Sequence, residues 1–138
     1  MELFTLYNEK PTITKSSVFG IIHYFPANNI FRFEFTINTE LNNEDAFTVF
    51  NFCNSNSILP KYKLITIMKT KLTPTKDIYD FYNAEFRNNH ILKETFVLVS
   101  ATLKVAGNFY LRVKKPKIPT KIFNNEPAAF NWINSEFL

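Results

Sequence analysis

TFVLVSATLKVAGNFYLRVKKPKIPTKIF, residues 95–123, is the stretch of sequence that decides the fold. Residues 95–99 form a continuous apolar run, which is typical of a strand that is buried on both faces. Ser100 is suited to cap a helix, and the apolar residues after it recur at helical spacing: Leu103, Ala106, Tyr110 and Val113. Two prolines then end the helix, and residues 120–123 form a second, short strand. A strand, a helix and a strand in this order predict a right-handed crossover between parallel strands.

The same stretch concentrates positive charge. Six basic residues lie between positions 104 and 121: Lys104, Arg112, Lys114, Lys115, Lys117 and Lys121. No acidic residue occurs between Glu94 and Glu126. The simplest interpretation is a solvated crossover, because cations favour the C-terminal end of a helix. The alternatives are a docking surface for an acidic protein or anionic ligand, and a nucleic-acid site that stacks bases on aromatic residues. We expect Phe109, Tyr110 and Phe123 to face the core, which argues against nucleic acid.

Toward the N-terminus the period changes to that of strands. Residues 18–25 and 30–37 are rich in β-branched and aromatic side chains, and Pro26-Ala27-Asn28-Asn29 between them has a turn composition. These two segments predict an antiparallel hairpin. Residues 3–7, and also residues 12–14, are candidates for an additional edge strand.

Helices and strands alternate after the hairpin. Asn42 begins a helix, residues 62–68 form a strand, and residues 73–75 open a second helix with an apolar face that extends to Phe86. A last helix begins at residues 124–127. We therefore expect a single α/β domain over residues 1–138, with a mixed, largely parallel sheet, an N-terminal antiparallel hairpin and about four helices.

Composition excludes several classes of protein. The chain has 138 residues, 46% of them hydrophobic, and 16 phenylalanines supply much of the core volume. No apolar run reaches the roughly 20 residues that a membrane-spanning helix needs, and the N-terminus lacks a signal-peptide pattern. We expect a soluble, cytoplasmic protein. Cys53 is the sole cysteine, so no intrachain disulfide forms, and the residue is expected in the core.

The alternation of elements and the motifs at its end resemble the STAS or SpoIIAA-like fold, and a group of small bacterial proteins built on it. The residues that carry the resemblance are Phe96–Ser100, Ala101–Val113, the Lys-Pro-rich residues 115–123, and Ala128 with Trp132. The resemblance is best over residues 62–137. It implies a regulatory or binding domain, since STAS domains commonly act as antagonists of anti-sigma factors or sense ligands and partners.

The resemblance also implies a place to look for phosphorylation. Antagonist STAS domains carry an Asp-x-Ser-Gly sequence after the middle strand, and the corresponding residues 68–76 here, MKTKLTPTK, lack it. Thr73 and Thr75 stand near that position and are candidates for a phospho-acceptor or anion site at a helix N-terminus. The plainer interpretation is that one of them caps the helix.

Motifs for catalysis are lacking. No Asp, Glu or Cys stands at a metal-ligand spacing around His23 or His90, and two isolated glycines cannot form a phosphate-binding loop. Asp77 and Asp80 lie three residues apart, as acidic residues in a first helical turn commonly do. We therefore predict no catalytic residue, no metal and no cofactor.

These observations favour a non-enzymatic, cytoplasmic regulatory or protein-interaction module, which binds a protein partner or associates with itself. The alternative is a domain that binds a small apolar, lipid or anionic ligand between the sheet and its helices. A weaker alternative is an enzyme whose site the sequence does not reveal. An exposed apolar patch with a basic rim favours the first, and an apolar pocket of a few hundred Å³ favours the second.

Overall fold

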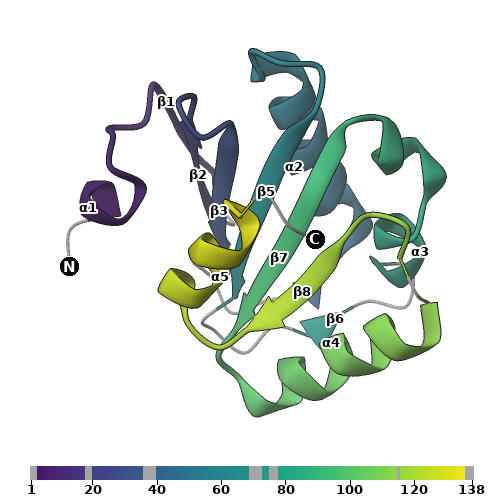
Figure 1. Ribbon diagram of the computed structural model, residues 1–138. Coiled ribbons are helices and arrows are strands. Elements are labelled where there is room, and N and C mark those ends of the chain that lie inside the picture. Colours follow the sequence, from purple (N-terminus) through teal and green to yellow (C-terminus); the bar gives the residue numbers. More distant parts are fainter. Residues whose placement is uncertain are drawn as a thin grey trace.

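The computed structural model describes residues 3–17, 20–35, 40–68, 73–74, 78–114 and 116–135 (Figure 1). Within these residues the helices are α1 (Leu3–Tyr7), α2 (Asn43–Asn56), α3 (Ile78–Tyr82), α4 (Ala101–Lys114) and α5 (Glu126–Ile133), with a 3₁₀ turn, η1 (Glu85–Asn89). The strands are β1 (Ile13–Ser16), β2 (Gly20–Phe25), β3 (Ile30–Phe35), β4 (Glu40–Leu41), β5 (Tyr62–Met68), β6 (Thr73–Pro74), β7 (Ile91–Leu98) and β8 (Thr120–Phe123).

The main sheet has the strand order β1-β2-β3-β5-β7-β8. The pairs β1–β2 and β2–β3 are antiparallel, and the pairs β3–β5, β5–β7 and β7–β8 are parallel. The predicted hairpin and the predicted largely parallel mixed sheet are therefore confirmed. The short strands β4 and β6 pair with each other in a separate two-stranded sheet.

Helices cover both faces of this sheet, so the molecule has three layers (Figure 1). Side chains of α2, α3 and α4 pack on one face, against residues such as Phe33, Leu64 and Phe96. On the other face, Tyr7 of α1 and two residues of α5, Ala129 and Ile133, pack on apolar residues of the central strands. Residues 93–98 of β7 are all buried, as expected for a strand between two helical layers.

Side-chain caps stabilise the first turns of three helices. The start of each of these helices was predicted from the local sequence. The Asp45 N–H donates to Asn42 Oδ1 over 3.0 Å at the start of α2, and the Ala128 N–H donates to Asn125 Oδ1 over 2.9 Å at the start of α5. Ser100 Oγ accepts from the Leu103 N–H over 3.3 Å. Ser100 is thus an N-cap.

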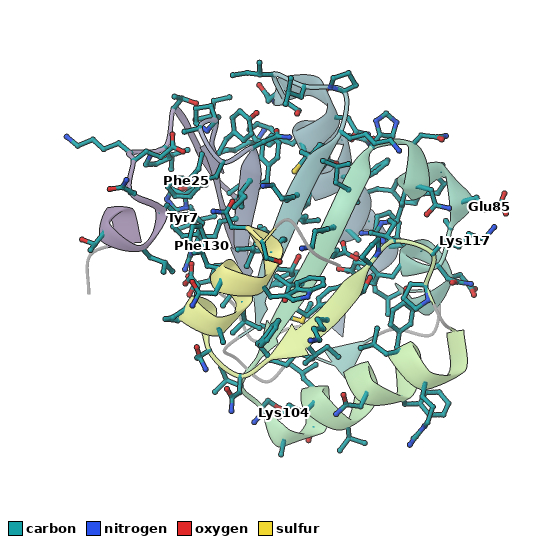
Figure 2. The ribbon with its side chains drawn as sticks, in the orientation of Figure 1. Tyr7, Phe25, Glu85, Lys104, Lys117 and Phe130 are labelled. Carbon is teal, nitrogen blue, oxygen red and sulfur yellow. The ribbon has the colours of Figure 1, made fainter. Side chains whose placement is uncertain are left out.

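The prediction of an edge strand at residues 3–7 is wrong, because these residues form α1. The Tyr7 side chain is fully buried, stacks on the Phe25 ring with centroids 4.0 Å apart, and meets the Phe130 ring edge-on at 4.9 Å (Figure 2). These contacts with distant residues stabilise a single turn of helix whose local sequence favours a strand. The edge strand predicted around residues 12–14 does form, as β1.

The second predicted helix is shorter than expected. Thr73 and Pro74 lie in β6 rather than in a helix, and α3 ends at Tyr82 instead of continuing to Phe86. The carbonyl of Tyr82 accepts from Arg87 Nη1 over 3.0 Å and from the Tyr110 hydroxyl over 2.8 Å. These side chains satisfy a carbonyl that a longer helix would use for its own backbone, and η1 follows.

Candidate functional site

One face of α4 packs on the sheet. Leu103 and Tyr110 are buried on this face, and Gly107 brings the helix close to the strands. A Cβ atom at position 107 would lie 2.7 Å from Ile122 Cδ1 and 2.8 Å from Leu98 Cδ1. The predicted core stripe is thereby confirmed at Leu103 and Tyr110, while the Val113 side chain lies outside the description.

The opposite face of α4 exposes two large apolar side chains. Val105 is 71% exposed and Phe109 is 52% exposed, and the two are four residues apart, so they lie one above the other on the helix. The expectation that Phe109 faces the core is wrong. Tyr110 takes the core position, and a neighbouring residue of a helix is turned away by about 100°. The exposure of this pair could be predicted from the sequence, because both residues fall outside the apolar stripe that was predicted to face the core.

Basic residues lie on α4 and on the neighbouring strand β8. Arg112 is exposed one turn after Phe109, and Lys104 lies on the side of α4 that faces β8. Lys121 is exposed on β8 but points to the face of the sheet opposite α4, because the neighbouring Ile122 packs under α4. We refer to Lys104, Val105, Phe109, Arg112 and Lys121 together as the α4–β8 surface. Within the described part of the chain, neither the Lys104 nor the Lys121 ammonium group forms an ion pair.

Of the remaining predicted basic residues, Lys117 has a described side chain. Lys117 lies elsewhere, beside Glu85, with 3.5 Å between Lys117 Nζ and Glu85 Oε1 (Figure 2). The backbone of Lys114 closes α4, but its side chain is not among those described, and Lys115 lies outside the described residues. Of the candidate phospho-acceptors, Thr73 lies in β6 and Thr75 falls outside the described residues, so that site stays a prediction.

A groove and a cavity adjoin α4. An open groove of about 310 Å³ runs between α4 and β8 and is lined by Lys104, Asn108, Ile122, Phe123 and Asn124. Beneath the helix is an apolar cavity of about 60 Å³, between α3, α4 and the sheet. Ligand pockets ordinarily measure about 300–1,000 Å³. The cavity therefore gives no support to the predicted alternative of an apolar or lipid ligand.

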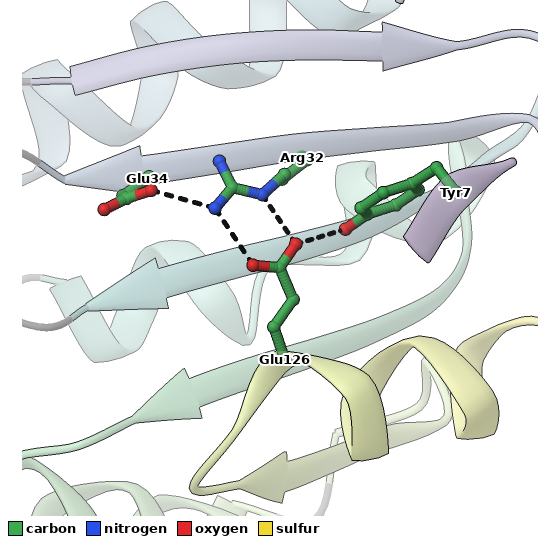
Figure 3. A network of polar contacts seen from close by, with 4 residues as sticks. All are labelled: Tyr7, Arg32, Glu34 and Glu126. Carbon is green, nitrogen blue, oxygen red and sulfur yellow. Dashed lines mark hydrogen bonds and ion pairs between the residues drawn. The ribbon is translucent and has the colours of Figure 1, made fainter. Parts of the chain in front are cut away.

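A polar network connects three elements on the α5 side of the sheet (Figure 3). Glu126, the first residue of α5, accepts from Arg32 Nε over 2.6 Å, from Arg32 Nη2 over 3.0 Å and from the Tyr7 hydroxyl over 2.7 Å. Glu34 accepts a further bond from Arg32 over 2.9 Å. Burial, together with the charge of Glu126, raises the pKa of Tyr7, so the phenol stays protonated and donates. The network links α1, β3 and α5.

His23 lies beside this network, directly opposite Arg32 on the neighbouring strand. Burial, and then the charge of Arg32, lower the pKa of His23, which favours the neutral imidazole. Its Nδ1 is buried and has no hydrogen-bond partner among the described residues. Within the described part of the chain, one ring nitrogen of this histidine is therefore unsatisfied beside the network.

A second polar cluster is buried beneath α3. Arg87 and Glu94 form an ion pair whose side chains are only 2% and 1% exposed, and the Tyr82 ring lies 4.9 Å from the guanidinium carbon. Burial opposes the charge of Arg87, but Glu94 more than offsets it and raises the pKa of Arg87. The two opposite charges neutralise each other and are shielded from solvent, which is typical of an ion pair that stabilises the fold.

The described residues offer no clear catalytic chemistry. No group of three His, Cys, Asp or Glu residues among them is arranged to hold a metal ion. Cys53 is fully buried, and burial raises the pKa of its thiol, which disfavours a reactive thiolate. Asp80 is exposed on α3, and Asp77 is outside the described residues. In the same described part of the chain, every helix is too short or too polar to cross a bilayer.

The chain matches a known protein family. A protein-family model described as a domain of unknown function (DUF7793) matches residues 24–136. No curated protein and no solved structure matches the chain. The matched region includes the α4–β8 surface, the Arg32–Glu126 contact and the buried Arg87–Glu94 pair, whereas Tyr7 and the rest of α1 precede it.

Proposed function

Because the chain belongs to the DUF7793 family, whose description assigns no activity, we propose its function from the α4–β8 surface: it is a cytoplasmic regulatory or protein-interaction module that binds an acidic partner protein. The observation that carries the proposal is the exposure of Val105 and Phe109 on one helix face, next to Arg112. Single exposed apolar residues are common on protein surfaces. An aromatic residue and an arginine beside a second apolar side chain are the composition that protein interfaces favour.

The resemblance to STAS or SpoIIAA-like domains supports the same proposal. The mixed sheet agrees with the fold that this resemblance implies, and such domains commonly act by binding other proteins. A resemblance of fold is weak evidence for function, so the exposed surface carries more weight.

Quantitative affinity purification from native lysate tests the proposal. The bait is the full chain, compared with the double variant Val105→Ser/Phe109→Ser. The matched control is Ile58→Ser/Leu59→Ser, which removes two apolar side chains that are 71% and 52% exposed, the same fractions as in the pair on α4. Substitutions at exposed positions ordinarily change stability by less than about 0.5 kcal/mol, so all three proteins should remain folded.

We expect the wild type and the control to retain the same partner protein, and the α4 variant to retain about tenfold less of it, or less still. This corresponds to about 1.4 kcal/mol of binding free energy. Equal recovery of every protein by the wild type and the α4 variant would reject this surface as the docking site.

A further inference from the structure

The strand β8 lies at the edge of the main sheet, next to β7 and with no further strand beyond it among the described residues. Figure 1 shows it between α4 on one side and α5 on the other. An uncovered edge presents backbone N–H and C=O groups that another strand can bind.

The hydrogen bonds to β7 show which backbone groups of β8 point outward. The Glu94 N–H donates to the Pro119 carbonyl over 3.0 Å, and Thr95 Oγ1 donates to the Lys121 carbonyl over 3.0 Å. The carbonyls of residues 119 and 121 therefore face β7. Because backbone groups alternate along a strand, those of Thr120 and Ile122 point away from the sheet.

The side chains beside this edge indicate the chemistry of an occupant. The Ile122 side chain lies under α4, so Lys121 points to the opposite face of the sheet. Lys104 stands on the α4 side, in the groove of about 310 Å³ between α4 and β8. The outward backbone groups thus lie between two lysines, one on each face, and no described carboxylate pairs with either.

We infer that β8 is a docking edge, at which an extended acidic segment of a partner protein adds as a further strand. This inference rests on the proposed function and specifies how the partner binds. Backbone hydrogen bonds to Thr120 and Ile122 hold the segment, and carboxylates on its two faces meet Lys104 and Lys121. A second copy of this chain fits less well, because its β8 brings the same lysines toward each other.

The test uses the full chain labelled with ¹⁵N and a synthetic peptide as probe. The peptide has about six residues, an ordinary strand length, and consists of Glu, Asp and Val with acidic residues at both odd and even positions. One control peptide is N-methylated at alternate amides, which keeps its charge but removes hydrogen-bond donors. A second control has Gln and Asn in place of Glu and Asp.

We expect the NMR signals of the Thr120 and Ile122 amides to shift as the peptide is added. The exchange of these amide hydrogens with solvent should slow about tenfold or more. Each control peptide should bind about tenfold more weakly than the acidic peptide, since each loses one of the two kinds of contact. The variant Lys104→Glu/Lys121→Glu should bind the acidic peptide about tenfold more weakly as well.

Three results would overturn the inference: no binding of the acidic peptide at millimolar concentration, equal binding of the N-methylated peptide, or protection of the β8 amides by dimerisation without peptide. Failure of this inference can be distinguished from failure of the proposed function. A partner captured through Val105 and Phe109 without any response at β8 rejects strand addition alone.

Discussion

At the scale of single residues, the burial of charged side chains is the feature that is hardest to predict from the sequence. Glu94 looks like the polar boundary before the apolar run of residues 95–99, yet it lies inside β7 and is 1% exposed. Burial of a carboxylate is tolerable only with a matched partner, and that partner, Arg87, belongs to η1. Lys93 is buried likewise: its ammonium group donates to the Trp132 carbonyl over 2.9 Å and lies 4.4 Å from the Trp132 ring centre.

Replacing Arg87 by methionine should destabilise the protein by about 3–5 kcal/mol, because it leaves the Glu94 carboxylate buried without a counter-charge. The double variant Arg87→Met/Glu94→Met should cost clearly less than the sum of the two single changes. Urea unfolding followed by circular dichroism measures these differences.

The exposed ion pair provides the control. Lys117 and Glu85 have side chains that are 75% and 85% exposed, so Lys117→Met should cost no more than about 1 kcal/mol. If Arg87→Met proves as mild as Lys117→Met, the buried pair does not stabilise the fold as described.

At the scale of elements, local signals located most boundaries. The strand predicted over residues 62–68 and the strand predicted over residues 120–123 have those bounds in the structure, since apolar runs and prolines limit them. The start of α2 follows from its Asn cap. By contrast, α1 depends on Phe25, Phe130 and Glu126, which are distant in sequence, and no local pattern reports such contacts.

The docking of α1 can be tested at Tyr7. Tyr7→Phe keeps the ring contacts and loses the hydrogen bond to Glu126, which should cost about 1 kcal/mol. Tyr7→Ala also removes the buried ring and should cost about 3–5 kcal/mol, with faster hydrogen exchange throughout α1. Thr5→Ala, at an exposed position of the same helix, is the control and should change neither quantity. An unchanged stability in Tyr7→Ala would contradict the packing of α1 on the sheet.

At the scale of the whole molecule, the alternation of strands and helices was sufficient to predict a mixed α/β sheet. The proposed docking surface was only partly predictable. The basic residues of the crossover were evident, but their positions depend on the folded sheet, which places Lys121 on the face opposite α4 and Lys117 beside Glu85. The prediction that both Phe109 and Tyr110 face the core fails for Phe109, because neighbouring positions of a helix differ by about 100° and Tyr110 takes the buried position.

The central claim, that this molecule binds an acidic partner through the α4–β8 surface, is tested most directly by charge reversal with a matched control. Lys104→Glu/Lys121→Glu and Lys10→Glu/Lys61→Glu reduce the formal charge of +4 by the same amount, and Lys10 and Lys61 are exposed lysines outside the α4–β8 surface. The measurement is the amount of partner that each protein retains from native lysate at low and at physiological salt. We predict that only the first variant loses the partner, and that the wild type retains less of it as salt rises. Equal retention by both variants would contradict the claim.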